Sequence, residues 1–336
     1  MPDPGRTNPE LGSHLNILLN SASLYITQGV APSTLKSYVS AWSWFTKFCF
    51  SFRIPILPIL ISTICAFVVH CFESRNLKIA TIRKLLAGIQ FHARFHNPNY
   101  PSIFSTPAIR LLLKGIEKSA QKTPDKCLPI TLNLLHRLTS SLSNSSFCEY
   151  INILLEAVFL SAFYGFMRLG EFASDSKIFN PARGLCLSDL RFSSSSFNLF
   201  IKYSKADSSG TGVTITISKI NFFCPYTSMV RYLKARPRTP KNSPLFILPN
   251  RLPMTKQWFR THLASVLTLC DLSPHLYTGH SFCIGAATTA AECGVPDSTI
   301  QMLGRWSSTA YKIYIRSDKQ ILLNAQQALS TYNQGS

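Results

Sequence analysis

The chain has 336 residues, 46% of them hydrophobic, a length and composition that exclude a disordered polypeptide and provide for about two packed domains. Its 34 Lys and Arg residues outnumber 15 Asp and Glu residues by 19, which is typical of proteins whose partner is a polyphosphate such as nucleic acid. The ten cysteines form no CxxC pair and no Cys/His cluster with zinc spacing, so we predict a reducing, intracellular compartment, no disulfide framework and no metal site.

The first third of the chain reads as a helical domain after a short tail. Residues 1–12 are polar and contain Pro and Gly, and we predict that they are disordered. Residues 13–118 show apolar side chains at helical spacing over about 34–49, 62–73, after Thr81 and over 107–118. The outer faces of these helices are basic, and Lys36, Arg83 and Lys84 are candidates for contacts with DNA. Residues 119–130 are polar with two prolines and are interpreted as a linker.

One segment of this domain has nearly the length of a membrane span. Residues 54–72 carry no formal charge over nineteen positions. Two prolines and several polar side chains interrupt the segment, which is untypical of a spanning helix. We therefore predict a Pro-rich loop followed by a buried core helix, and no membrane partner.

The remainder, residues 131–336, is predicted to form a second domain. Helical spacing covers Leu132–Leu142 and Tyr150–Tyr164, and the period changes to two between Leu185 and Ile220. Two β-branched and aromatic stretches there, 197–203 and 213–218, predict a hairpin or the edge of a small sheet. The rest is helical in pattern. The fold class is therefore mainly α with a small β-sheet.

A basic segment, residues 208–270, holds nine Lys and Arg residues and no Asp or Glu. A run of charge is usually a solvated face, but nine cations without a counter-charge favour a surface that follows a DNA backbone. The candidates for contacts with DNA in this segment are Arg236, Arg238, Lys241, Lys256 and Arg260.

Two motifs suggest a specific chemistry. The string 162–171 reads AFYGFMRLGE, and residues 279–316 read GHSFCIGAATTAAECGVPDSTIQMLGRWSSTAYKIYIR. Together they resemble the catalytic domain of tyrosine recombinases, and most closely the recombinases of Crypton and DIRS-type mobile elements. The resemblance implies a helical core-binding domain at 13–118 and a catalytic domain at 131–336. It also implies that a tyrosine cuts and rejoins DNA through a 3′-phosphotyrosine without metal or other cofactor.

The upstream part of the resemblance supplies the first two implied catalytic residues. Arg168 matches the first arginine of the family, and Glu171, three residues on, could hold it in place. Lys205, in the turn between the two strands, matches the lysine that is the candidate acid for the 5′ oxygen. Lys202 lies close enough in sequence to compete for this role. An Arg–Glu pair at a helix end and a solvated turn lysine are the corresponding structural alternatives.

The downstream motif supplies the remaining implied residues and one departure. His280 opens the family's His-x-x-Arg motif, but the arginine position holds Cys283, which is shorter and cannot grip a phosphate as a guanidinium does. Trp306 matches the family's His or Trp, although core packing would suit it equally well. Tyr314 is the candidate nucleophile, favoured over Tyr311 by its spacing from Trp306.

The resemblance implies double-stranded DNA as partner, a homotetramer on DNA, and a place in the nucleus. Because of Cys283, a catalytically inactive DNA-binding protein derived from such a recombinase stays open as the alternative. A third interpretation takes residues 286–303 as a helix-turn-helix of a transcription-factor-like module, with Gly294 in the turn. That interpretation leaves Arg168, Lys205 and Tyr314 without a role.

Overall fold

The structure is a computed structural model that describes residues 9–97, 99–120, 127–204, 210–306 and 312. The chain divides into two compact units, Met1–Lys122 and Thr123–Ser336, and the division falls in the segment interpreted as a linker. Each unit has a hydrophobic core of its own.

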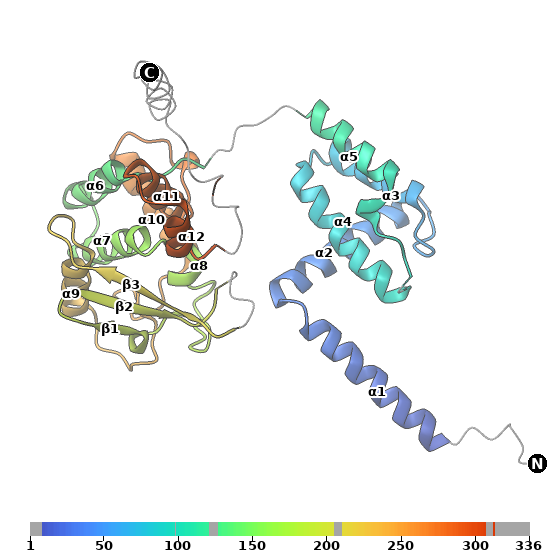
Figure 1. Cartoon of the computed structure of the whole chain (residues 1–336), viewed down its shortest axis with the longest axis horizontal. Helices are drawn as coiled ribbons and strands as arrows, with labels where there is room; N and C mark the ends of the chain where they lie inside the picture. Colours follow the sequence, from blue (N-terminus) through green and yellow to red (C-terminus); the bar gives the residue numbers. More distant parts are fainter. Residues whose placement is uncertain (1–8, 98, 121–126, 205–209, 307–311, 313–336) are drawn as a thin grey trace, which may run out of the picture. The chain divides into compact units, whose positions relative to one another are not determined.

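The first unit contains only helices and turns in its described part (Figure 1). Its α-helices are α1 (Pro9–Gln28), α2 (Pro32–Ser51), α3 (Ile61–Val69), α4 (Ile79–His96) and α5 (Pro107–Ser119). A π-helical turn at His70–Ser74 extends α3, and a 3₁₀ turn covers Ile103–Ser105.

The start of α1 differs from the prediction of a disordered tail. Residues 9–12 are helical, so the prediction is wrong for them, whereas residues 1–8 lie outside the described part of the chain. A proline is tolerated in the first turn of a helix because its missing N–H would have no partner there. Pro9 is therefore compatible with this start.

The core of the first unit forms where α2 and α4 pack closely. A Cβ atom on Gly88 of α4 would lie 2.5 Å from the Cβ of Ala41 on α2, so only glycine permits this approach. Phe45 of α2 and Ile64 and Phe67 of α3 are fully buried in this core. The apolar segment 54–72 therefore forms a loop followed by the core helix α3, as predicted. Among the described residues, no helix has both the length and the apolar character that a membrane span needs.

The second unit combines seven α-helices and a small sheet in its described part (Figure 1). The helices are α6 (Leu132–Ser141), α7 (Glu149–Tyr164), α8 (Leu169–Phe172), α9 (Pro225–Ala235), α10 (Lys256–Leu269), α11 (Ser281–Glu292) and α12 (Asp297–Gly304). The antiparallel sheet has the order β1 (Leu190–Phe192), β2 (Ser196–Ile201) and β3 (Val213–Ser218), with Leu199 opposite Ile215. The predicted hairpin is therefore β2–β3, and the mainly helical class with a small sheet is confirmed.

Helix α11 runs through the core of this unit. Its residues 281–288 are all buried, and a Cβ on Gly285 would lie 1.8 Å from the carbonyl oxygen of Ile130. Ile130 is fully buried, and its N–H donates to the carbonyl oxygen of Ser281 at 3.0 Å. The N–H of Leu128 donates to the carbonyl oxygen of Leu276 at 2.7 Å. Residues 128–130, at the end of the segment interpreted as a linker, are thus part of the second unit, where their backbone is hydrogen-bonded and Ile130 belongs to the core.

Candidate active site and DNA contacts

The turn after α7 sets the position of Arg168. Helix α7 ends at Tyr164, and Phe166 takes a left-handed conformation with φ 48° that reverses the chain before α8 begins. Arg168 is the residue that caps the start of α8, and its backbone N–H donates to Glu171 Oε2 at 2.9 Å. The expected Arg168–Glu171 pair is present, with Nη1 3.2 Å from Oε1. The pairing arises from this capping arrangement and not from two positions inside a longer helix.

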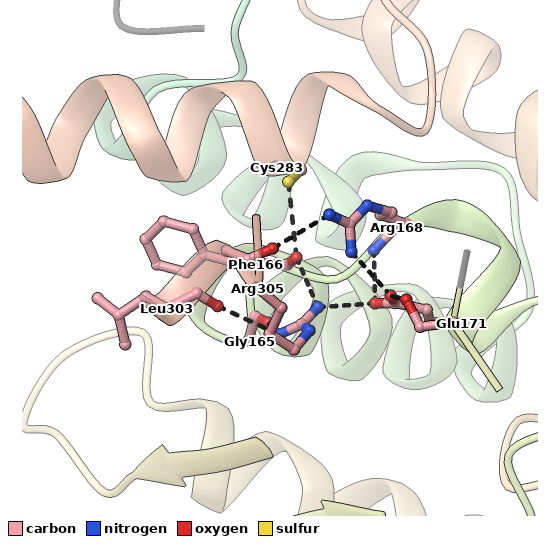
Figure 2. Close-up of polar contacts among 9 residues, drawn as sticks. Gly165, Phe166, Arg168, Glu171, Cys283, Leu303 and Arg305 are labelled. Atoms are coloured by element: carbon pink, nitrogen blue, oxygen red, sulfur yellow. Dashed lines mark hydrogen bonds and ion pairs between the residues drawn. The ribbon is translucent and has the colours of Figure 1, made fainter. Parts of the chain in front are cut away.

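Glu171 is the centre of a group of polar side chains, which we call the Glu171 cluster: Arg168, Glu171, Ser204 and Arg305. The Glu171 side chain is only 3% exposed. Its carboxylate also accepts from Ser204 Oγ at 3.0 Å and from Arg305 Nη2 at 2.8 Å. Two guanidiniums thus share one buried carboxylate (Figure 2). A buried carboxylate is tolerated only when it is paired and hydrogen-bonded, as it is here.

The two candidate lysines differ in what the structure reveals. Lys205 lies outside the described residues, directly after Ser204 of the Glu171 cluster. The ammonium of Lys202 is 2.7 Å from Asp189 Oδ2 and 3.0 Å from the Pro181 carbonyl oxygen. Lys202 is therefore held by Asp189 and Pro181, and its ammonium is used inside the protein.

His280 comes to the same neighbourhood from α11. It caps the start of that helix, is half-buried, and its backbone N–H donates to Thr278 Oγ1 at 3.1 Å. A Cβ on Gly279 would lie 2.9 Å from the Cβ of Leu169. The residue before His280 and the residue after Arg168 are therefore in contact, although they belong to motifs that lie far apart in the sequence.

Cys283 faces the turn that carries Phe166. Its side chain is fully buried, and Sγ is 3.5 Å from the Phe166 carbonyl oxygen (Figure 2). Burial raises the pKa of the Cys283 thiol to about 12, against a weaker lowering by the guanidiniums of Arg168 and Arg305. The thiol is therefore neutral at physiological pH and contributes no positive charge where the family motif has an arginine.

The chain after α12 brings Arg305, which the sequence analysis did not select, into the Glu171 cluster. Arg305 has a left-handed backbone with φ 56°, and its side chain turns back toward Gly165 and Glu171. No local pattern in the sequence indicates this, because a left-handed arginine is uncommon. Trp306 packs on this turn: a Cβ on Gly304 would lie 1.8 Å from its ring, and the centroid of the Phe166 ring is 6.3 Å from its own.

The candidate nucleophile Tyr314 and its rival Tyr311 both lie outside the described residues. Within the part of the chain that is described, no three His, Cys, Asp or Glu side chains are grouped so as to hold a metal ion.

The candidates for DNA contacts fall into three groups. Those of the first group are exposed: Lys36, Lys84, Arg238, Lys241 and Arg260. In the second group, Arg83 is also exposed but pairs with Glu117 at 2.7 Å, and Lys256 pairs with Asp175. The third group is Arg236 alone.

Arg236 requires a correction. It is 7% exposed, and its guanidinium donates to the carbonyl oxygens of Leu245 at 3.0 Å, Pro237 at 3.1 Å and Pro244 at 2.7 Å. These bonds tie the end of α9 to the segment before α10. The prediction that Arg236 contacts DNA is wrong, because the residue is buried and each of its three guanidinium nitrogens donates to a carbonyl oxygen inside the protein.

Several solved structures are similar to the chain. The XerH site-specific recombinase bound to a palindromic difH substrate matches with a TM-score of 0.61 and 16% identity, over 86% of this chain and 76% of that one. A lambda integrase dimer bound to a COC′ core site matches with a TM-score of 0.59 and 14% identity, over 90% and 95% of the two chains. The Tn1549 transposon integrase in complex with circular intermediate DNA gives 0.54 and 17%, over 81% and 86%. Neither a protein-family model nor a curated protein matches the sequence.

The chain has the tyrosine-recombinase fold. At these identities the likeness establishes the fold and leaves the activity to be argued from the site. Of residues 286–303, which the third interpretation takes as a helix-turn-helix, Ala286, Ala287, Thr288 and Ile300 are buried in the second unit. Within the tyrosine-recombinase fold of this chain, the Glu171 cluster, His280 and Cys283 come from segments that are far apart in sequence.

Proposed function

We propose that the chain is a DNA-binding tyrosine recombinase of a mobile element, in which Cys283 strongly slows strand cleavage. The observation that carries the proposal is the Glu171 cluster, where Arg168 is held beside the buried Cys283 in a chain of this fold. The solved structures that are similar include recombinases and integrases in complex with DNA, and the balance of 34 basic to 15 acidic residues suits the same partner.

The proposed reaction needs no cofactor. The Tyr314 hydroxyl oxygen attacks the scissile phosphorus, a P–O bond to tyrosine forms, and the bond to the 5′ oxygen breaks. The tyrosine hydroxyl gives up its proton to water, and the leaving 5′ oxygen takes a proton from Lys205, the proposed donor, which regains one from water. Arg168 and His280 would stabilise the charge that develops on the phosphate oxygens, and Trp306 would donate a further hydrogen bond. Joining is the reverse of these steps.

Cys283 is the weak point of this proposal as an active enzyme. A neutral, buried thiol cannot replace a guanidinium that binds two phosphate oxygens. Removing one preorganised phosphate contact costs on the order of a hundredfold to a thousandfold in rate. The alternative function, DNA binding without catalysis, is favoured by this one residue and by nothing else in the described part of the chain.

The test is a suicide-substrate assay with nicked DNA that scores the covalent protein–DNA adduct. Its arms are the wild-type chain, Cys283→Arg, and Cys283→Arg combined with Tyr314→Phe. We expect a faint or absent adduct for wild type, a gain of about a hundredfold or more with Cys283→Arg, and complete loss in the double variant.

The outcomes separate the two functions. An adduct in Cys283→Arg that needs Tyr314 supports a recombinase site weakened at one position. DNA binding without adduct in every arm supports the non-catalytic alternative. A wild-type adduct as abundant as that of Cys283→Arg contradicts the role given to Cys283.

The finer parts of the proposal follow from the motifs. Residues 279–316 favour a Crypton or DIRS-type element, and such a recombinase would act in the nucleus as a homotetramer on DNA. Light scattering of the chain on a DNA duplex that carries its target would test the tetramer, and a monomer at saturating DNA would contradict it.

A further inference from the structure

Arg305 donates more hydrogen bonds than Arg168, the other arginine of the Glu171 cluster. It leaves α12 with a left-handed backbone, and its side chain is 12% exposed. Nη1 donates to the carbonyl oxygens of Gly165 at 3.0 Å and Leu303 at 3.2 Å. Nη2 donates to the carbonyl oxygen of Phe166 at 3.0 Å and to Glu171 at 2.8 Å. All four Nη hydrogens of Arg305 are thus given to protein acceptors, while the buried Nε has none in the described part of the chain (Figure 2).

Arg168 is used less completely. Its side chain is 21% exposed, with one bond from Nη1 to Glu171 and one from Nη2 to the Gly304 carbonyl oxygen, each 3.2 Å. A guanidinium has five N–H hydrogens. Within the described part of the chain, three of those on Arg168 have no protein acceptor.

The charges of the cluster explain why both arginines are needed. A single arginine paired with Glu171 would leave no net charge, whereas two guanidiniums and one carboxylate leave a net charge of +1. The hydrogen bonds described for Arg305 are all directed into the protein, so the charge that remains for an outside anion is that of Arg168, which has N–H hydrogens without an acceptor among the described residues.

We propose that Arg305 is a positioning residue that neutralises Glu171 and holds the Gly165–Phe166 turn, so that Arg168 keeps its charge and donors for a phosphate anion. This rests on the proposed function, in which that phosphate belongs to DNA. It assigns no phosphate contact to Arg305 itself, and Arg305 therefore does not replace the guanidinium missing at Cys283.

The test measures binding of inorganic phosphate, with chloride at matched ionic strength as the reference, to the full chain and its variants. Arg305→Asn removes the charge but tolerates the left-handed backbone, since Asn adopts this conformation more readily than most residues. Arg305→Lys keeps the charge without the four-bond pattern. The double variant Arg305→Asn with Glu171→Gln restores the net charge of +1. Arg53→Asn is the matched control, an exposed arginine that also has a left-handed backbone, with φ 53°.

We expect Arg168→Gln and Arg305→Asn each to weaken phosphate binding by roughly tenfold or more. Arg305→Lys, the double variant and Arg53→Asn should stay within about threefold of wild type. Recovery in the double variant is the decisive readout, because a residue that acts only on structure would not be rescued by removing a second contact. If Arg305→Asn does not fold, Arg305→Lys and the double variant are compared directly with wild type. Weak phosphate binding in both would then overturn the inference.

Three results would overturn the inference. Phosphate binding in Arg305→Asn equal to wild type would show that its charge is not needed. If Arg305→Lys and the double variant both bind phosphate as weakly as Arg305→Asn does, the role of Arg305 is structural and does not depend on its charge. Unchanged binding in Arg168→Gln would remove Arg168 as the anion site. None of these arms needs strand cleavage, so a failed adduct assay with the expected phosphate series would contradict only the proposed function.

Discussion

In the Glu171 cluster two arginines share one buried carboxylate, whereas along the basic segment 208–270 the cations range from buried to exposed. Arg236 is buried and bonded to three carbonyl oxygens, Arg231 pairs with Glu156, and Arg238 is exposed. A positively charged residue in the sequence can therefore have one of three roles. It can stabilise the fold through buried hydrogen bonds, it can pair with a surface acid, or it can be an exposed charge available to DNA. Only burial and partners distinguish these three.

The largest expected effect comes from removing the acid of the cluster. Glu171→Ala would leave two guanidiniums without the carboxylate between them, and breaking such a buried pair costs about 3–5 kcal/mol of the free energy of unfolding. Denaturant unfolding followed by tryptophan fluorescence measures the change.

The matched control is an acid that pairs with the basic segment. Asp175 contacts Lys256, but its side chain is 88% exposed, so Asp175→Ala should cost less than about 1 kcal/mol. Equal losses for Glu171→Ala and Asp175→Ala would mean that burial does not separate the two regions.

The second effect contrasts two arginines that are close in sequence. Arg236→Met leaves the carbonyl oxygen of Pro244 without its donor and that of Leu245 with the Tyr232 hydroxyl alone, and we expect a loss of about 2 kcal/mol. Arg238→Met, at an exposed position, should change the free energy of unfolding by less than about 0.5 kcal/mol. Thermal and denaturant unfolding of the two variants measure the difference. An Arg236→Met variant as stable as wild type would show that the buried and the exposed arginine do not differ in their contribution to stability.

The helices could be predicted from the sequence because each has an apolar face that packs on a core. Helix α5 was expected over 107–118 and is found at Pro107–Ser119, and the hairpin was found because its two strands alternate. Strand β1 was not predicted, since a strand of three residues, Leu190–Phe192, is too short to show a period. Residues 9–12 were expected to be disordered because their composition is polar.

The candidate site was predicted only where a motif marks it. Arg168, His280 and Cys283 were selected by resemblance, and the structure brings their segments together. Arg305 was missed because its place depends on a left-handed turn and on partners more than 130 positions away, Glu171 among them.

The basic segment shows a second limit of prediction from sequence. It has no acid of its own, yet Glu156 and Asp175, from earlier in the chain, pair with two of its cations. Absence of acid in a stretch of sequence is therefore not absence of acid in space.

The third effect concerns affinity for DNA. Each of Arg238→Gln, Lys241→Gln and Arg260→Gln should weaken binding about equally on all sequences and lower the slope of log K against log salt by about one. Arg231→Gln, in the same segment but paired with Glu156, should lower the slope less. Titrations at several salt concentrations provide the slopes. Identical slopes for all four variants would show that pairing does not matter for this surface.

The smallest effect concerns a residue of the basic segment that is held uncharged. His262 stacks on Trp258 with ring centroids 3.6 Å apart, and its Nδ1 is 2.9 Å from the Trp258 carbonyl oxygen. Burial lowers the pKa of His262 below its ordinary value of 6.5, against a smaller raising by that hydrogen bond. A lowered pKa in the folded state means that protons bind more tightly to the unfolded chain.

At His262 the free energy of unfolding is thus at its full value above pH 6.5. It decreases as the pH falls below that value, because the unfolded chain then binds the proton more readily than the folded one. We expect His262→Gln, which cannot be protonated, to lose less stability than wild type when denaturant unfolding is repeated from neutral to mildly acidic pH. The reason is that only the wild-type chain gains a proton on unfolding at this position. Parallel pH profiles for the two proteins would mean that His262 does not titrate differently on folding.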